Sequence, residues 1–281
     1  MMKVISTIAA MQAVAREVHG TGRSIGLVPT MGFLHEGHLS LMHLARERAD
    51  ILVASIFVNP TQFGPNEDLA LYPRNLARDT ALCASSGVDY LFCPSTSEMY
   101  ASDCTVFVDE DTLSTGLCGA SRAGHFRGVL TVVAKLFNMV LPDVAVFGQK
   151  DAQQAALIQR MVRDLNFPIE IVVAPIVREP DGLAMSSRNT YLSADERAEA
   201  LWLHRALDQA KASAAAGAAS RAVLVSDMRA LLAREAPGVN IEYIEVVAAV
   251  SLVPVDSAVP GVLIAIAAKV GKTRLIDNII L

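Results

Sequence analysis

Short apolar runs alternate with longer helical patterns over the first two-thirds of the chain, and this alternation restricts the fold more than any other feature. The first apolar run spans residues 24–30 and ends in Pro-Thr. Residues 38–50 carry apolar side chains three or four positions apart, which predicts a helix. Residues 51–58 form an almost unbroken apolar run, typical of a strand buried on both faces of a parallel sheet. These segments predict a βαβ unit with a right-handed crossover.

The same alternation continues to residue 174. Its pattern predicts helices and strands in turn. The predicted helices cover 76–86, 129–141 and 151–165, and the predicted strands cover 89–93, 144–147 and 169–174. We therefore expect an α/β fold with a Rossmann-like, doubly wound parallel sheet of the kind that binds nucleotides.

The pattern changes near residue 176. An Ala-rich helical region over 194–235 is followed by three β-rich runs. The runs cover 240–248, 261–269 and 273–280, and the turn at 270–272 between the last two is typical of a hairpin. We expect a smaller C-terminal α+β domain over residues 177–281, with residues 1–176 as the nucleotide-binding domain.

The composition excludes several classes of protein. A chain of 281 residues that is 52% hydrophobic can bury a substantial core, which excludes a disordered chain and a small disulfide scaffold. Its 24 Lys and Arg against 29 Asp and Glu leave a formal net charge of −5. This balance does not favour a general nucleic-acid binder, and anionic ligands would need local pockets.

Compartment signals point to the cytoplasm. Gln12, Arg16 and Glu17 interrupt the apolar stretch of residues 1–20, which therefore lacks the pattern of an export signal. No window contains the roughly 18 apolar residues in a row that a membrane span needs, so no membrane association is expected. The four cysteines have no C-x-x-C spacing, and we expect reduced thiols rather than a disulfide or metal site. They are Cys83, Cys93, Cys104 and Cys118.

Three short motifs resemble known fingerprints but lack the required context. In residues 20–26 (GTGRSIG) the third glycine comes one place too late for G-x-G-x-x-G, and a strand follows instead of a helix. Residues 271–273 (GKT) resemble the end of a P-loop, but Ile266 occupies the place of its first glycine. His35 and His38 are three residues apart, whereas a zinc-protease helix places its histidines four apart.

The most informative segment is residues 29–38 (PTMGFLHEGH), which leaves the first predicted strand and enters a helix. Ligands of open α/β sheets bind at this edge, and a helix N-terminus favours phosphate. Gly32 and Gly37 let the backbone approach a ligand closely. His35 and His38 can donate hydrogen bonds to phosphoryl oxygens.

This segment resembles the H-x-G-H motif of the nucleotidylyltransferase superfamily, in the P-T-M-G-x-L-H-x-G-H form of the pantothenate synthetases (pantoate–β-alanine ligases). Five further blocks follow in the order of that family. They are 57–63 (FVNPTQF), 72–74 (YPR), 125–129 (HFRGV), 147–151 (FGQKD) and 185–189 (MSSRN). H-x-G-H alone identifies the superfamily, whereas six ordered blocks identify the family.

The resemblance implies an AMP-forming ligase of pantothenate biosynthesis that works in two steps. The pantoate carboxylate attacks the α-phosphate of ATP, giving pantoyl adenylate and pyrophosphate. The amine of β-alanine then attacks the acyl carbon, giving pantothenate and AMP. The resemblance further implies ATP as a co-substrate with Mg²⁺, no tightly bound prosthetic group, and a homodimer. The sequence itself shows no dedicated metal site. It places nucleotide and pantoate in the domain of residues 1–176, with residues 177–281 closing over the ATP site.

The resemblance also assigns roles to single residues. His38, His35 and Lys150 are the expected catalytic residues, Gln62 and Gln154 are expected to bind pantoate, and Gln62 also β-alanine. The residues expected to bind ATP are Met31, Gly32, Phe33, Leu34, His35, Glu36, Gly37, His38, Gly148, Gln149, Lys150, Asp151, Val177, Met185, Ser186, Ser187 and Arg188. No definite role is assigned to Asn59, Tyr72, Arg74, Asp79, His125 or Arg127.

Two other functions stay open on the sequence. One is another H-x-G-H adenylyltransferase that acts on a phosphate-bearing acceptor; Gln62 and Gln154 argue against it, because a phosphate would favour Arg or Lys there. The other is a nucleotide-binding module without catalytic activity. Four residues that occur together argue against that alternative: His35, His38, Lys150 and Arg188.

Overall fold

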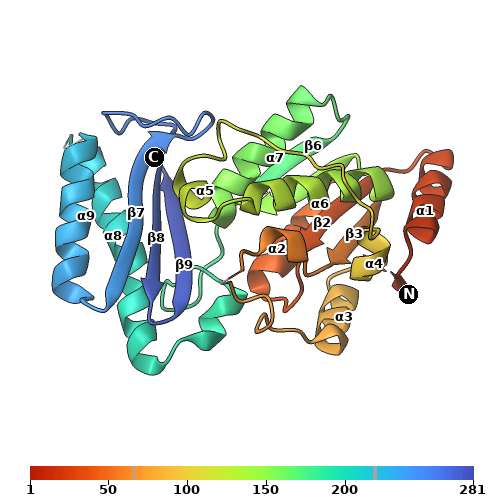
Figure 1. Ribbon diagram of the computed structural model, residues 1–281, viewed down its shortest axis with the longest axis horizontal. Coiled ribbons are helices and arrows are strands. Elements are labelled where there is room, and N and C mark those ends of the chain that lie inside the picture. Colours follow the sequence, from red (N-terminus) through yellow and green to blue (C-terminus); the bar gives the residue numbers. More distant parts are fainter. Residues whose placement is uncertain (66, 218–219) are drawn as a thin grey trace.

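The structure, a computed structural model, describes residues 1–65, 67–217 and 220–281. Its larger sheet has six parallel strands in the order β1-β4-β3-β2-β5-β6 (Figure 1). The strands are β1 (Lys3–Ile5), β2 (Ile25–Thr30), β3 (Ile51–Ile56), β4 (Tyr90–Phe92), β5 (Val144–Gly148) and β6 (Glu170–Ala174). All neighbouring strands are parallel, as the apolar runs predict.

Helices cover both faces of this sheet, because successive side chains of a strand point to opposite faces. Leu27 packs in one apolar cluster with α1 (Ile8–Gly20), α6 (His125–Val140) and α7 (Ala152–Asp164). Val28, the next residue, packs in a second cluster with α2 (Glu36–Arg46) and α3 (Leu76–Ser85). The short elements are η1 (Pro60–Gln62), α4 (Thr96–Met99), α5 (Leu117–Ser121), η2 (Gln149–Asp151) and η3 (Ser187–Tyr191).

The strand order reverses between β2 and β5. From β2 the chain runs through α2 to β3 and through α3 to β4 on one side, and α6 then returns it to β5 on the other side of β2. The two strands pair side by side, with Gly26 opposite Val144. In open α/β sheets the crevice outside the carboxyl ends of the strands at such a point binds the ligand. The topology therefore predicts where the site lies.

A second, antiparallel sheet follows in the chain. It consists of β7 (Val239–Ala248), β8 (Val262–Val270) and β9 (Thr273–Ile280), with α8 (Ala194–Ala215) and α9 (Arg221–Glu235) packed on one face. Figure 1 shows this part beside the six-stranded sheet, with β9 at the edge next to the larger part. Leu263 and Ala265 of β8 pack against Leu117 of α5, which joins the two parts through apolar contact.

The predicted fold class is confirmed, and several local features differ from prediction. Helix α2 ends at Arg46, whereas the predicted helix extends to residue 50. The N-terminal β1 and α1 precede the first predicted strand. Helix α6 begins at His125, four residues before its predicted start. The prediction started late because Gly128 weakens the helical pattern of the sequence, whereas in the structure packing accommodates this glycine inside the helix. The predicted helical region over 194–235 consists of the two helices α8 and α9. The domain boundary at residue 176 stays a prediction.

None of the helices in the described ranges combines the length and apolar character that a bilayer crossing requires. The four cysteines are free thiols. Burial raises the pKa of Cys83 to about 12 and that of Cys93 to about 11, so both thiols stay protonated at neutral pH.

Candidate active site

A cavity of about 230 Å³ lies outside the carboxyl ends of β3, β2, β5 and β6, at the point that the topology predicts. Pro29 of β2, Phe57 after β3, Phe147 of β5 and Pro175 after β6 are parts of its wall. It continues into a wider hollow of about 990 Å³ beside the β8–β9 hairpin. The residues that line both spaces are Arg122, His125, Lys150, Asp151, Ser186 and Arg188.

Most of the site residues expected from the sequence meet at this cavity. The expected residues that line it are Met31, His35, Gly37, His38, Gln62, Gly148, Lys150, Asp151, Gln154, Val177, Met185, Ser186, Ser187 and Arg188. The expected ATP-binding residues that do not line it are Gly32, Phe33, Leu34, Glu36 and Gln149. Segments far apart in the chain thus contribute to one space.

The two histidines of the H-x-G-H motif stand at the start of α2. The helix begins at Glu36 and His35 is its N-cap, with the imidazole centroids of His35 and His38 4.0 Å apart. Nδ1 of His38 accepts a hydrogen bond from the His35 backbone N–H at 3.3 Å. Burial, followed by the positive charge of Lys150, lowers the pKa of His35 to about 4. Burial and the neighbouring imidazole lower the pKa of His38 well below its usual value. Both rings are therefore neutral near pH 7.

A buried carboxylate holds the turn that carries these histidines. Asp79 of α3 is 1% exposed and accepts hydrogen bonds from the backbone N–H groups of Phe33 at 2.7 Å and Leu34 at 2.9 Å. These two N–H groups are thus used inside the protein. Gly37 keeps the turn open for His35, because a Cβ at this position would lie 3.0 Å from its imidazole. Asp79 therefore shapes the turn from outside the cavity.

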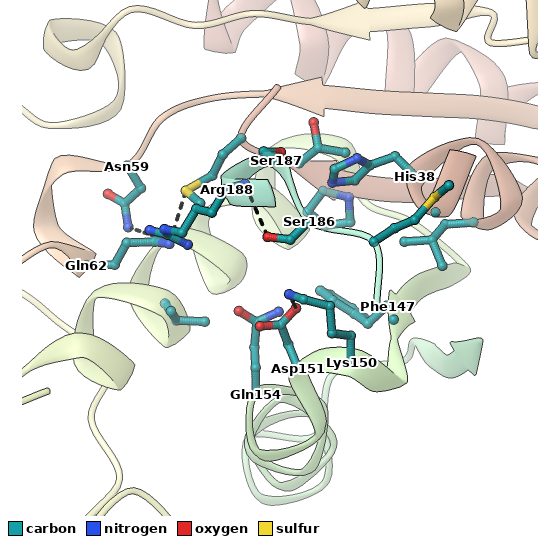
Figure 2. A pocket seen from close by; sticks show the side chains of 18 of the residues that line it. His38, Asn59, Gln62, Phe147, Lys150, Asp151, Gln154, Ser186, Ser187 and Arg188 are labelled. Carbon is teal, nitrogen blue, oxygen red and sulfur yellow. Dashed lines mark hydrogen bonds and ion pairs between the residues drawn. The ribbon is translucent and has the colours of Figure 1, made fainter. Parts of the chain in front are cut away.

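Lys150 stands at the turn between β5 and α7. Its Nζ lies 3.3 Å from Oδ2 of Asp151, which occupies the N-cap position of α7 without making a capping hydrogen bond. Burial opposes ionisation of Asp151, but the charges of Lys150 and Arg188 outweigh it and lower the pKa of the carboxyl. Figure 2 shows Lys150, Asp151 and Gln154 pointing from the start of α7 toward the same space.

The two glutamines of the site come from different elements. Gln62 lies on η1 and Gln154 on α7. Asn59 donates hydrogen bonds to Oε1 of Gln62 and to the carbonyl oxygen of Gly128, both at 3.1 Å. Nε2 of Gln62 donates to Sδ of Met31 at 3.2 Å (Figure 2). The amide of Gln62 is therefore held in a defined orientation at the cavity wall.

The segment that begins η3 reaches across from beyond residue 176. Ser187 donates a hydrogen bond to the carbonyl oxygen of Phe33 at 3.1 Å, and Oγ of Ser186 accepts one from the Arg188 backbone N–H at 3.3 Å. The Arg188 guanidinium binds both carboxylate oxygens of Asp68, each at 2.8 Å. Ser187 thus fastens this segment to the turn that carries the histidines.

Comparison with known proteins decides the family. The model of the family pantoate-β-alanine ligase matches residues 3–280. The chain belongs to the pantoate-β-alanine ligase family. It is 54% identical to the pantothenate synthetase of Thermosipho africanus over 280 residues, covering 100% of both chains. It is 53% identical to that of Moorella thermoacetica over 284 residues, covering 100% of this chain and 99% of the relative.

Solved structures of pantoate-β-alanine ligases have the same fold. The pantothenate synthetase of Thermus thermophilus superposes with a TM-score of 0.93 at 44% identity, over 99% of both chains. The pantoate-β-alanine ligase of Francisella tularensis, complexed with β-γ ATP and β-alanine, has a TM-score of 0.83 at 34% identity, over 100% of this chain and 98% of the other. This chain is therefore an enzyme of that family.

Arg122 lines the cavity but lies outside the blocks by which the sequence resembles pantoate-β-alanine ligases. Its Nε and Nη2 donate to the two carboxylate oxygens of Glu67, both at 2.6 Å, and its Nη1 lies 2.8 Å from Nε2 of His125. Nδ1 of His125 lies 2.8 Å from the carbonyl oxygen of Gln62. The only sequence signal for Arg122 is its place three residues before the H-F-R-G-V block.

The other residues without an assigned role divide into two groups. Asn59 and Tyr72 line the cavity together with His125. Arg74 instead donates to the carbonyl oxygen of Tyr72 at 3.0 Å, and Arg127 stacks 4.2 Å above the ring of Phe107. Within the described residues, no group of three or more His, Cys, Asp and Glu side chains is placed to hold a metal ion.

Proposed function

We propose that this chain joins pantoate and β-alanine in two steps, with ATP as the activating co-substrate and pantoyl adenylate as the intermediate. One observation carries the proposal: His38, Gln62, Lys150 and Gln154, from three separate segments of the chain, line a single cavity at the switch point of the sheet. The complex of the Francisella tularensis ligase with β-γ ATP and β-alanine supports ATP and β-alanine as ligands of this family.

In the first step the pantoate carboxylate attacks the α-phosphorus, and the bond to the pyrophosphate oxygen breaks. His35, His38 and Lys150 then stabilise the negative charge on the phosphoryl oxygens. Nδ1 of His35 is buried without a hydrogen-bond partner in the described part of the chain, as expected of an atom that a ligand satisfies. Ser186, Ser187 and Arg188 bind the outer phosphates, and the backbone of Val177 contacts the adenine.

The remaining expected ATP contacts have different parts in this proposal. In this proposal the residues that border the nucleotide are Met31, Gly37, Gly148, Asp151 and Met185, and their place in the cavity lining supports this. Gly32, Phe33, Leu34 and Glu36 act by forming the turn before α2. Gln149 acts by holding the turn that carries Lys150.

Gln62 and Gln154 bind pantoate, because neutral amides can bind a carboxylate and hydroxyl groups without adding a charge that competes with Lys150. An apolar part of the cavity lining suits the two methyl groups of pantoate. Val129, Val132, Val133 and Leu136 of α6 form this part. In the second step the β-alanine amine, near Gln62, attacks the acyl carbon, loses a proton and displaces AMP.

Several accompanying features belong to the same proposal. Mg²⁺ enters as the complex with ATP, and no tightly bound prosthetic group is required. The enzyme works in the cytoplasm as a homodimer. Residues 1–176 bind the nucleotide and pantoate, and residues 177–281 close over the ATP site as a second domain.

Product analysis tests this function against its rivals. Pyrophosphate release should depend on pantoate, and AMP release should require β-alanine in addition. Adenylylation of a phosphate ester without β-alanine would support another H-x-G-H adenylyltransferase. Intact ATP binding without turnover of any acceptor would support a module that lacks catalytic activity. Either of these two outcomes overturns the proposal.

A further inference from the structure

One side chain of the small sheet holds the turn on which Lys150 stands. Asn278 lies on β9, at the edge next to the six-stranded part, and is 3% exposed. Its Nδ2 donates hydrogen bonds to the carbonyl oxygens of Gln149 and of Lys150, both at 3.0 Å. Its Oδ1 accepts a hydrogen bond from Nε2 of Gln149 at 3.2 Å. All three of these hydrogen bonds of the Asn278 amide are thus made with residues of η2.

The neighbouring residue of β9, Asp277, binds next to a second segment of the site, the one that carries Ser186 and Arg188. Asp277 is also 3% exposed, and its two oxygens accept hydrogen bonds from Nη1 of Arg178 at 2.6 Å and Nη2 at 3.0 Å. Arg178 pairs with Ala184, next to the segment that carries Ser186 and Arg188. Successive residues of a strand face opposite sides. Asn278 and Asp277 therefore bind two different segments, each more than 90 positions before β9 in the chain.

The bonds of Asn278 are directed at the backbone, which makes them specific for the position of the turn. Apolar contacts around Leu117 and Leu263 already hold the small sheet against the six-stranded part. A buried amide is therefore not needed merely to keep the two parts together. The two carbonyl groups that Asn278 satisfies are those of Lys150 and the residue before it. Removing the amide would take one hydrogen-bond donor from each of these two carbonyls, so the backbone of the turn would be held less firmly.

We propose that Asn278 is a positioning residue that holds the Lys150 ammonium in place for pantoate activation. This inference rests on the role of Lys150 in the proposed function. Nζ of Lys150 lies at the end of a flexible side chain, so its position depends on how firmly its backbone is held. A displacement of about 1 Å in a charged group can lower a rate about 100-fold.

Substitution of Asn278 tests this role against a plain loss of stability. Asn278→Ala should lower kcat for pantoate-dependent pyrophosphate release between about 10-fold and 100-fold, and change KM for pantoate less than about twofold, since Gln62 and Gln154 are untouched. The matched control is Thr131→Ala. Thr131 is 3% exposed, and its hydroxyl bonds both backbone groups of Val108 away from the cavity. Thr131→Ala should lower the thermal midpoint similarly but keep kcat.

A double-mutant cycle shows whether the effect passes through the lysine. If Asn278 acts by positioning Lys150, adding Asn278→Ala to Lys150→Ala should lower kcat little further. Asn278→Ser, which keeps one donor, should fall between wild type and Asn278→Ala, and it replaces the alanine variant if that variant does not fold. Equal effects of Asn278→Ala in the presence and absence of Lys150, or a kcat no lower than that of Thr131→Ala, overturn the inference. An inactive wild-type enzyme would instead contradict the proposed function.

Discussion

The backbone N–H of His35 donates to Nδ1 of His38, and this hydrogen bond determines what the second imidazole can offer a ligand. Because Nδ1 accepts, the neutral ring carries its proton on Nε2. The low pKa of His38 keeps the ring neutral at pH 7. His38 is therefore a fixed hydrogen-bond donor through Nε2 rather than a cation, so in the proposed function the positive charge beside the phosphates comes from Lys150 and Arg188.

Substitutions of His38 that keep or remove the Nε2 donor test this assignment. His38→Ala should lower kcat for pantoate-dependent pyrophosphate release about 100-fold to 1,000-fold, the cost of removing one transition-state donor. His38→Gln places an amide N–H near the Nε2 position and should retain more activity than His38→Asn, whose amide reaches only the Nδ1 position. Circular dichroism should show all three variants folded. Higher activity in His38→Asn than in His38→Gln would contradict the tautomer.

The pH dependence of stability follows from His125. Its Nδ1 faces the Gln62 carbonyl oxygen at 2.8 Å and its Nε2 faces an Arg122 nitrogen at 2.8 Å, so Nδ1 holds the proton and Nε2 accepts. Burial, followed by the Arg122 charge, lowers the pKa of His125 to about 4; the hydrogen bond to Gln62 and the carboxylates of Glu67 and Asp151 only partly oppose this.

The unfolded chain binds protons on this imidazole near its usual pKa of 6.5, above the folded pKa of about 4. The free energy of unfolding should therefore fall as pH drops from about 6.5 toward 4, because the unfolded state takes up more protons. Urea denaturation at a series of pH values measures the slope. His125→Asn, which keeps the donor to Gln62 but does not titrate there, should reduce the slope; an unchanged slope would contradict the assignment.

The sequence was sufficient to predict the parts of the fold that depend on local patterns. The β2–α2–β3 unit follows from long apolar runs and helical spacing. By contrast, β1 has three residues and buries only Ile5, so no period could indicate it. The start of α6 was hidden by Gly128, whose place in a helix is decided by contact with a distant turn.

The same division holds for the cavity. Motifs predicted the residues that line it, such as His38 and Lys150, because their chemistry is local. The side chains that hold those motifs act across the fold and leave no local signal. Asp79 bonds a backbone N–H 46 positions away, and Asn278 a carbonyl 128 positions away. Such contacts depend on how the sheets are packed, which spacing in the sequence does not encode.

Gly128 lets α6 pack against the turn that carries Gln62. A Cβ at this position would lie 2.4 Å from the carbonyl oxygen of Thr61 and 2.7 Å from the backbone nitrogen of Gln62. Gly128→Ala should therefore lower the free energy of unfolding by about 1–3 kcal/mol and raise KM for pantoate. Gly20→Ala, at the last residue of α1 with nothing within 4 Å of the new Cβ, is the control and should change neither quantity adversely. A wild-type KM in Gly128→Ala would show that Gln62 does not depend on this contact.

Asp68 binds the guanidinium of Arg188 with both carboxylate oxygens. The two hydrogen bonds, each at 2.8 Å, form an arrangement in which a phosphate can replace the carboxylate. If Arg188 binds the outer phosphates, ATP must compete with this carboxylate, so Asp68→Asn should lower KM for ATP. The pair is 26% and 24% exposed, so a decrease of about two- to fivefold is expected. Asp164→Asn removes the partner of Arg163 in an exposed pair and should leave KM for ATP unchanged. Steady-state pyrophosphate release at saturating pantoate measures KM for ATP in both variants.

A higher KM for ATP in Asp68→Asn would mean that the Asp68 carboxylate holds Arg188 in its binding position instead of competing with ATP.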